Sequence, residues 1–479
     1  MVEAQIITDA FAAWVGRQRW FVGKVASPKL RHIASIMLHR DSLHRESLHR
    51  ESLHRDSLHR DSLIEVAIIL VGERSEAREV IYQVPLVLRR IPKDATEPGF
   101  IATITEGDGG EWHLYDGPHD PAFTEQLRRL IARDESAGDS LASARGIAVS
   151  EWPTSATHSR VLRGEQSNTS IVYSSDTGDG PSVICKIFRM LHHGDNPDVV
   201  LQSALFTAGS TSVPQIYGSV VATWPDESQP GGQAHGHLAF AQRFLAGARD
   251  AWGLALAAGS TLADFAASAH DIGIATADIH ATLASTMPTH DASRHDIDST
   301  VAAWRARLDA ALDEVPELAP LRPSINLLYT RAASVPWPRL QSIHGDLHLG
   351  QVLAIPNGTW AIIDFEGEPM RPLAERTLPD LPLRDVAGML RSFDYAAGSQ
   401  TPSPDVLEWA HDCRTAFLDG YIAGSGHDVR KDRVLLDAFE LDKALYEVVY
   451  EAHNRPSWLP IPTNAVRRIT DRVEVDLGR

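Results

Sequence analysis

Cysteine is scarce in this sequence of 479 residues, and its two copies, Cys185 and Cys413, lie far apart. Two isolated cysteines supply neither a disulfide framework nor the paired spacing of a zinc site. This pattern is typical of proteins in a reducing compartment, so we expect a cytoplasmic protein.

An excess of basic charge is also lacking. Lys and Arg total 45 against 63 for Asp and Glu, which gives a formal net charge of −18. This balance argues against the basic surface that nucleic acids or anionic membranes require. It leaves nucleotide binding open, because a few local cations and backbone amides are enough to hold phosphates.

Long apolar runs are absent as well. No stretch approaches the roughly 18 to 20 apolar residues of a membrane span. The N-terminal segment contains Glu3 and has no long apolar core, so we do not expect a signal peptide. The sequence therefore predicts a soluble protein.

A pentapeptide repeat interrupts the N-terminal region. Residues 38–62 are five tandem copies of LHR(D/E)S, and a period of five matches neither a helix nor a strand. Without the copies, "IASIM" would run almost directly into "IEVAIILVG", and the two would form a β-hairpin. We interpret the tract as an expansion within a surface connection, since long loops cost little extra closure entropy. The alternative is metal binding by its five histidines, which metal-dependent ordering of the tract would support.

The pattern along the chain predicts an α+β protein in three parts. Residues 1–95 form a small, mainly β cap subdomain led by a helix around Phe11–Trp14. Residues 96–246 form a β-rich lobe, and residues 247–479 form a helical lobe. One β-rich island, "QSIHGDLHLGQVLAIPNGTWAIIDFEGEP", interrupts the helical part. A chain of this length is expected to contain two or three packed units.

The island carries the strongest chemical signal. His344, Gly345 and Asp346 are followed after four residues by Gln351 and, at the end of the next strand, by Asp364. Protein kinases use an Asp, four spacer residues and an Asn, and then a metal-binding Asp-Phe-Gly. The departures seen here are typical of the small-molecule branch of kinase-like folds, which includes the aminoglycoside phosphotransferases. The alternative is an ordinary polar loop, which a lone His-x-Asp would favour.

These residue types suit phosphoryl transfer to a hydroxyl group. Asp346 would orient the hydroxyl and accept its proton, which makes it the candidate catalytic base. Gln351 and Asp364 would supply an amide oxygen and a carboxylate, the hard ligands that Mg²⁺ prefers. His344 is expected to fix the loop rather than to react.

A phosphate-binding segment is expected upstream of the island. "GEQSNTSIVYSS" and "PSVICKIFRM" read as two strands joined by a turn. Lys186 on the second strand would reach the ATP phosphates, although a lone Lys in an apolar strand is usually an edge residue. The loop before the first strand would present amides and hydroxyls from Gln166, Ser167, Asn168, Thr169 and Ser170. No acidic partner of Lys186 is evident, and Asp198 is interpreted as a helix N-cap.

Segments across the whole chain resemble the bacterial maltokinases. They include "RQRWFVGK" at 17–24, "YQVPLVLR" at 82–89, "GEQSNTSIVY" at 164–173, "HGDLHLGQVL" at 344–353, "DFEGEPMRPLAER" at 364–376 and "YEVVYEAHNRPSWLPIP" at 446–462. The resemblance implies a bilobal, aminoglycoside-phosphotransferase-like kinase fold with an N-terminal cap. It implies that ATP and Mg²⁺ are used to make maltose 1-phosphate for α-glucan (glycogen) synthesis, and that the protein forms a complex with a trehalose synthase. The repeat tract, and Val200 where an acid is expected, depart from the family pattern.

The resemblance also places the sugar site near the last long helix. At helical spacing, one face of this helix carries Lys443, Glu447, Glu451 and Asn454, with Tyr446 and Tyr450 beside it, and Trp458 follows the helix. The predicted substrate-binding residues are His344, Tyr446, Glu447, Glu451, Asn454 and Trp458. From the pattern alone, an ordinary solvated helix with salt-bridging charges would be favoured. Arg371 and Arg376 either stabilise phosphate charge or hold the loop through Asp385 or Asp394, and we favour the structural role.

Two alternatives to a maltokinase stay open on the sequence. A kinase of glucosamine, another sugar or an aminoglycoside would keep the mechanism, and the acidic residues Glu447 and Glu451 would suit a cationic acceptor. A non-catalytic pseudokinase that serves a glucan-metabolising enzyme is the second, but pseudokinases commonly lose one of the three residues Asp346, Gln351 and Asp364, all of which are present.

Overall fold

The computed structural model describes residues 4–21, 23, 28–40, 63–74, 79–93, 98–106, 109–162, 167–178, 180–368, 371 and 373–475. The chain divides into two compact units. The first consists of Met1–Val199 and Gln215–Ala246, and the second of Val200–Pro214 and Gly247–Arg479. Among the described residues, no helix combines the length and the apolar character needed to cross a membrane.

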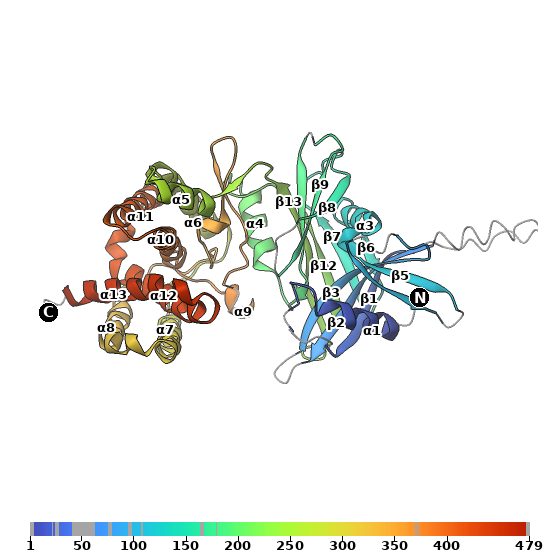
Figure 1. The fold of residues 1–479 in the computed structure, drawn as a ribbon, viewed down its shortest axis with the longest axis horizontal. Coiled ribbons are helices and arrows are strands. Elements are labelled where there is room, and N and C mark those ends of the chain that lie inside the picture. The colour runs from blue at the N-terminus through green and yellow to red at the C-terminus, as the bar shows by residue number, and fades with distance from the viewer. Residues whose placement is uncertain are drawn as a thin grey trace, which may run out of the picture. The chain divides into compact units, whose positions relative to one another are not determined.

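The first unit begins with helix α1 (Ala4–Val15) and a six-stranded antiparallel sheet (Figure 1). Its strands lie in the order β1 (Leu30–Arg40), β2 (Ile64–Arg74), β3 (Glu79–Arg89), β5 (Glu111–Asp116) and β4 (Phe100–Thr105), and β11 (Met190–Leu191) also pairs with β3. The predicted hairpin on either side of the repeat tract is confirmed, because β1 pairs with β2 as far as Arg40 and Glu65. The first three residues of the tract belong to β1, and residues 41–62 lie outside the described part of the chain.

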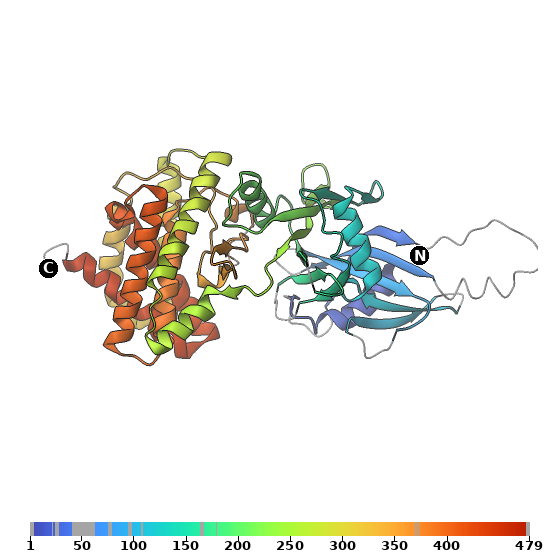
Figure 2. The same cartoon turned by 90° about the horizontal axis from the view of Figure 1, so that it is seen from above.

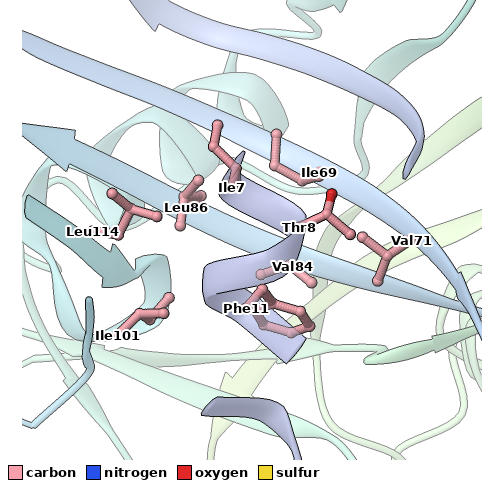
Figure 3. Close-up of a pocket in the computed structure, with 9 residues that line it drawn as sticks. All are labelled: Ile7, Thr8, Phe11, Ile69, Val71, Val84, Leu86, Ile101 and Leu114. Atoms are coloured by element: carbon pink, nitrogen blue, oxygen red, sulfur yellow. The ribbon is translucent and has the colours of Figure 1, made fainter. Parts of the chain in front are cut away.

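Both faces of this sheet are buried, which explains the nearly continuous apolar sequence of β2. Alternate residues of a strand point to opposite faces. Ala67, Ile69 and Val71 pack in one core with α1, and Val66, Ile68 and Leu70 pack in another. Figure 3 shows the first of these faces, where Ile7, Thr8 and Phe11 of α1 lie against apolar side chains of β2 and β3 around a small pocket. A one-residue shift of register would exchange the two faces.

A seven-stranded sheet forms the rest of the first unit. Its order is β6 (Ser136–Gly138), β7 (Ser143–Ala148), β12 (Ile216–Pro225), β13 (Gln233–Phe244), β10 (Ser182–Ile187), β9 (Thr169–Ser174) and β8 (His158–Val161). Helix α3 (Pro121–Ala132), which follows the short 3-10 helix η1 (Gly117–His119), shares a core with both sheets. The side-chain amide of Gln83 in β3 also donates to the carbonyls of Phe188 and Leu238.

The predicted strand pair around Lys186 is confirmed, because β9 and β10 are antiparallel neighbours. Cys185 is fully buried, as the alternation in β10 predicts, and Lys186 points the other way. The predicted end of the cap at residue 95 falls between β3 and β4, inside the six-stranded sheet. The proposed boundaries between the cap and the lobes stay a prediction.

The second unit is mainly helical, as expected from the sequence (Figure 2). Its helices are α5 (Ala251–Thr261), α6 (Ala266–Thr286), α7 (Arg294–Glu314), η2 (Pro316–Leu321), α8 (Arg322–Ala332), α9 (Leu373–Arg376), α10 (Leu383–Gly398), α11 (Pro404–Ser425), η4 (Val429–Asp432), α12 (Arg433–Asn454), η5 (Pro456–Trp458) and α13 (Pro460–Val475). Helix α4 (Pro197–Thr207) begins in the first unit and ends in the second. The predicted β island contributes β15 (Val352–Ala354) and β16 (Trp360–Ile362) to a three-stranded sheet, and the third strand, β14 (Arg249–Asp250), precedes α5.

Glycines let the helices around the island approach closely. A Cβ atom at Gly273 of α6 would overlap the carbonyl of Phe417 in α11, and one at Gly420 of α11 would overlap the carbonyl of His270 in α6. A Cβ at Gly388 of α10 would lie 2.6 Å from the carbonyl oxygen of Leu347. The close packing therefore fixes α6, α10 and α11 behind the loop that carries Asp346.

Candidate active site

The loop that carries Asp346 is held by a buried carboxylate at the start of α10. Asp385 Oδ2 accepts a hydrogen bond from the His344 amide, and Oδ1 accepts one from the Gly345 amide, each at 2.8 Å. Gly345 has a φ of +83°, a conformation that glycine adopts without strain. Two charge-assisted bonds from consecutive amides fix the backbone immediately before Asp346.

A second layer of contacts fixes Asp385 itself. His280 Nε2 of α6 lies 3.0 Å from Asp385 Oδ2, and His280 Nδ1 lies 2.9 Å from the Tyr421 hydroxyl of α11. Because an ionised carboxylate only accepts, His280 donates to it from Nε2, and the Tyr421 hydroxyl holds the other side of the ring. Burial acts to raise the pKa of Asp385, but these hydrogen bonds and the nearby histidines outweigh it, so the pKa lies below its ordinary value.

His344 serves the loop from a buried position. Its Nε2 lies 3.0 Å from the Ile363 carbonyl oxygen and therefore donates, while its Nδ1 accepts from the Asp346 amide at 3.3 Å. Only 2% of the residue is exposed. Both ring nitrogens are thus used inside the loop, which agrees with the expected loop-fixing role. Its predicted contact with the sugar stays a prediction.

Asp346 is bonded to a lysine that was not among the predicted site residues. Lys443 Nζ of α12 donates to Asp346 Oδ1 at 2.9 Å and lies 4.9 Å from the centre of the Tyr446 ring. Burial acts to lower the pKa of Lys443, but Asp346 and Glu368 outweigh it and raise the pKa, so the ammonium stays charged. The contact occupies one carboxylate oxygen of Asp346 and limits its rotation.

The two predicted metal ligands lie side by side. Gln351 Nε2 of the 3-10 helix η3 (Leu349–Gln351) donates to Asp364 Oδ2 at 3.1 Å. Asp364, just after β16, has a φ of +68°, a left-handed conformation that is uncommon outside glycine and often marks a functional position. An amide oxygen and a carboxylate are both hard ligands, so this pair fits Mg²⁺.

Buried ion pairs surround Asp346 and Lys443. Arg307 of α7 lies 3.0 Å from Glu368 and 2.9 Å from Asp442, and Arg384 lies 2.6 Å from Asp380. Burial raises the pKa of Asp442 even though Arg307 and Arg384 act to lower it. These residues were not predicted from the sequence, because their partners come from separate segments.

The two arginines after Asp364 bond elsewhere than predicted. Arg371 lies 3.8 Å from Asp380, and Arg376 Nε donates to the Arg371 carbonyl at 2.7 Å. Asp385 is instead held by His280, as described above. The other proposed anchor, Asp394, accepts from Arg391 at 2.7 Å.

In the first unit, Lys186 has a partner that the sequence interpretation missed. Lys186 Nζ lies 3.2 Å from Asp198 Oδ2 at the start of α4. The interpretation of Asp198 as an N-cap is wrong, because Asn196 Oδ1 accepts the Asp198 amide at 2.9 Å and therefore caps the helix. Asp198 is thus the acidic partner of Lys186 on a following helix.

The predicted phosphate-binding loop is only partly exposed. Thr169 and Ser170 are buried in β9, and the Thr169 hydroxyl accepts a hydrogen bond from Arg189. Ser167 is exposed and Asn168 is half-buried, whereas Gln166 lies outside the described residues. Contact of this segment with ATP stays a prediction.

The predicted sugar-binding residues differ in what they contact. Glu447 Oε2 accepts two hydrogen bonds from Arg391, at 2.9 and 2.7 Å, and Glu451 accepts from Arg455. Asn454 donates to the Tyr450 carbonyl at 2.8 Å, so its side chain closes the end of α12. Their contact with a sugar stays a prediction.

Aromatic rings lie along the same helix and the turn after it. Tyr446 and Tyr450 are nearly parallel, with ring centres 6.3 Å apart. The Arg455 guanidinium lies 5.4 Å from the centre of the Tyr450 ring and 4.8 Å from that of Trp458. Tyr450 is exposed, and Tyr446 and Trp458 are half-buried.

Every carboxylate of α12 is paired with arginine. The helix has five acidic side chains, and the pairs are Asp437 with Arg433 and Arg472, Glu440 with Arg414 and Arg468, Asp442 with Arg307, Glu447 with Arg391, and Glu451 with Arg455. The acidic surface expected from the sequence is therefore neutralised by its neighbours.

Comparison with known proteins links this chain to two kinds of sugar kinase. Residues 14–120 match the family model of the maltokinase N-terminal cap domain. A glucosamine kinase of Streptacidiphilus jiangxiensis is 30% identical over 281 residues, which cover 54% of this chain and 62% of that protein, so less than two thirds of that relative is matched. A glucosamine kinase of Mycolicibacterium smegmatis is 26% identical over 373 residues, which cover 70% of this chain and 89% of that protein.

Solved structures show the same fold. A glucosamine kinase in complex with glucosamine, ADP and inorganic phosphate is 22% identical, with a TM-score of 0.65, over 98% of this chain and 100% of that one. Another glucosamine kinase structure (crystal form B) is 23% identical, with a TM-score of 0.67, over 97% of this chain and 99% of that one. The predicted kinase-like α+β fold with an N-terminal cap is confirmed, and so is the predicted resemblance to the maltokinases.

Proposed function

We propose that this chain, which joins a maltokinase N-terminal cap to a kinase-like fold, is an ATP-dependent sugar kinase that converts maltose to maltose 1-phosphate. The observation that carries the proposal is the position of Asp346, on a loop fixed by Asp385 and bonded to Lys443, with Gln351 and Asp364 held together on the following segment. Kinases require this set of a base and two oxygen ligands in one short stretch.

In the proposed reaction, the anomeric oxygen of maltose forms a bond to the γ-phosphorus of ATP as the bond from that phosphorus to the ADP oxygen breaks. Asp346 accepts the proton of the attacking hydroxyl. Lys443 keeps the carboxylate oriented through its 2.9 Å contact with Oδ1, which leaves Oδ2 for the substrate. Lys186, paired with Asp198, steadies the ATP phosphates.

Gln351 and Asp364 would hold Mg²⁺, which when bound supplies positive charge to the phosphate oxygens. The left-handed backbone at Asp364 fixes the direction in which its carboxylate leaves β16. The hydrogen bond between the two side chains keeps both ligands in place before the nucleotide binds.

A neutral sugar suits this site better than an amino sugar. The ammonium group of glucosamine needs a carboxylate that is not already neutralised, and all five acids of α12 are paired with arginine. Lys443 would also repel an ammonium close to Asp346. Tyr446, Tyr450 and Trp458 offer aromatic faces of the kind that cover the C–H surface of sugar rings.

Glucosamine is the second candidate acceptor, because both curated relatives and the two solved structures described above are named glucosamine kinases. A non-catalytic role is less well supported, since pseudokinases commonly lose one of Asp346, Gln351 and Asp364, and all three are present. The association with a trehalose synthase and a place in glycogen synthesis stay predictions from the family resemblance.

The test is release of ADP from ATP and Mg²⁺ with maltose, glucose, glucosamine, trehalose or an aminoglycoside. The Asp346→Asn protein is the matched control, because asparagine keeps the shape of the side chain and cannot act as the base. We expect turnover with maltose, and ³¹P and ¹H NMR should show that the product carries its phosphate on the anomeric oxygen. In the variant, we expect kcat to fall about 10²- to 10⁴-fold.

The other outcomes separate the candidates. Turnover with glucosamine in place of maltose would keep the mechanism and replace the acceptor. Full activity of Asp346→Asn would remove Asp346 as the base. Nucleotide binding without turnover on any acceptor would overturn the kinase assignment in favour of a binding role.

A further inference from the structure

The segment that leads into α4 is docked on strand β13 by its backbone. Gly194 pairs with Gly236 in an isolated parallel bridge, and the Gly194 amide donates to the His235 carbonyl at 2.8 Å. A Cβ atom at Gly236 would come within 2.5 Å of the His192 carbonyl oxygen, so the close approach requires glycine there. The His193 ring adds to these backbone contacts, because its Nδ1 accepts from the His235 amide at 3.3 Å.

A chain of contacts runs from β13 through this segment to Lys186. His237 Nδ1 of β13 accepts from the Asn196 amide at 3.1 Å. Asn196 Oδ1 accepts from the Asp198 amide at 2.9 Å, and Asp198 Oδ2 lies 3.2 Å from Lys186 Nζ. All four residues belong to the first unit, and each contact fixes the next.

The first contact depends on the protonation state of His237. Neutral imidazole accepts at Nδ1 only when the proton sits on Nε2, and doubly protonated imidazole donates at both nitrogens. Protonation would therefore place an N–H of His237 against the N–H of Asn196. The hydrogen bond would be lost and replaced by repulsion.

We infer that His237 and Asn196 are positioning residues that hold Asp198 against Lys186, and that protonation of His237 loosens this arrangement and weakens nucleotide binding. The inference rests on the proposed role of Lys186 in binding ATP. It gives the kinase a sensitivity to acid that originates outside the catalytic loop.

The surroundings of His237 favour its neutral form. Burial lowers the pKa of His237, and nearby His235 on the same strand acts in the same direction, while Asp195 on the docked segment opposes them. On the neighbouring strand β12, its cross-strand partner is the uncharged Val221. A lowered pKa means that the hydrogen bond is intact near neutral pH and is lost below the ordinary histidine value of about 6.5.

A matched pair of substitutions isolates the acceptor atom. In His237→Asn, the amide oxygen takes the place of Nδ1 and accepts at every pH, whereas in His237→Gln the amide group extends to the place of Nε2 and leaves the Asn196 amide without its partner. His235→Asn is the control for a neighbouring exposed histidine. A second pair, Asn196→Asp and Asn196→Ala, keeps or removes the oxygen that accepts the Asp198 amide.

The measurement is binding of Mg²⁺–ADP to the full-length proteins by calorimetry from about pH 8 to about pH 5.5. KM for ATP and kcat are measured in parallel by steady-state assays. In the wild type and in His235→Asn, we expect the Kd to rise about two- to tenfold as the pH falls, the effect of a single hydrogen bond. We expect His237→Asn to bind tightly across the range and His237→Gln to bind weakly across it. We also expect KM for ATP to change while kcat at saturation is largely kept.

Other results would overturn the inference. If His237→Asn and the wild type showed the same pH dependence, or if His237→Gln and Asn196→Ala bound as tightly as the wild type at neutral pH, the contacts would have no positioning role. Equal loss of kcat and affinity together with a lowered melting temperature in both members of each pair would indicate a purely structural role. Failure of the wild type to bind Mg²⁺–ADP at any pH would contradict the proposed function itself, which separates the two failures.

Discussion

Lys443 and Asp346, from segments 97 residues apart, form a 2.9 Å ion pair in which the lysine occupies one oxygen of the candidate base. Lys443→Met should leave Asp346 free to rotate, and misplacement of a reacting group by about 1 Å can cost about 10²-fold in rate. We therefore expect kcat to fall about 10- to 100-fold with little change in KM for ATP. Lys443→Arg, which keeps a donor, should recover part of the rate in steady-state assays. Wild-type kcat in Lys443→Met would contradict the orienting role.

Asp364→Asn should specifically impair the response to Mg²⁺. Asparagine tolerates the left-handed backbone found at this position, so the substitution changes the ligand without straining β16. Because even supporting contacts around metal ligands contribute 10- to 100-fold in affinity, we expect the Mg²⁺ concentration for half-maximal rate to rise by more than about tenfold. Titration of the rate with MgCl₂ at fixed ATP measures this, and an unchanged midpoint would show that Asp364 is no ligand.

Asp385→Asn should change how stability depends on pH. The pKa of Asp385 is lowered in the folded protein, so the unfolded state binds more protons, and the stabilisation is present above the unfolded value of about 3.9 and lost as the pH falls further. At neutral pH we expect the variant to lose about 1–3 kcal/mol of stability, because two loop amides and His280 lose a charged acceptor. Urea unfolding at about pH 7, 5 and 3 should show that the difference from wild type shrinks in acid.

Glu447→Leu distinguishes a structural from a sugar-binding role of that carboxylate. Its removal leaves the buried Arg391 without one of its partners, and breaking a buried ion pair costs about 3–5 kcal/mol. We expect a lower melting temperature, whereas the matched variant Trp458→Ala should raise KM for the sugar and leave the melting temperature nearly unchanged. A normal melting temperature combined with a raised KM in Glu447→Leu would assign Glu447 to the sugar.

Both cysteines should be inert in the folded protein. Burial raises the pKa of Cys185 to about 12 and, with nearby acids, that of Cys413 to about 12. At pH 8 a thiol of that pKa is ionised in only about one molecule in ten thousand, and the thiolate is the reactive form. Neither thiol should react with Ellman's reagent until urea unfolds the protein, and rapid labelling of the native protein would contradict the burial of the reacting cysteine.

Local patterns allowed much of the fold and part of the site to be predicted. The alternation in β10, the spacing from Asp346 to Gln351 and the hairpin on either side of the repeats each depend on residues close in sequence. The pairing of Lys443 with Asp346 could not be predicted, because no periodicity links α12 to a loop 97 residues earlier. The sequence also shows the acids of α12 without the arginines from α7, α10, α11 and α13 that neutralise them.

The contact of Asp198 with Lys186 could not be predicted for a different reason. An acid beside a proline at the start of a helix is a good N-cap candidate, and the choice between Asn196 and Asp198 depends on which side chain turns back to the helix amides. The other side chain is then available for Lys186, and only the three-dimensional structure reveals which one that is.

The pairing of β1 with β2 does not depend on the number of pentapeptide copies between the two strands. Arg40 and Glu65, paired in register and joined by an ion pair at 2.8 Å, mark the two points where the repeated segment leaves and rejoins the sheet. Because closure of a connection costs only about 0.6 kcal/mol more for each doubling of its length, copies can be gained or lost between these points at little thermodynamic cost. Chains that differ in the number of copies would then share the same two-stranded pairing of β1 with β2.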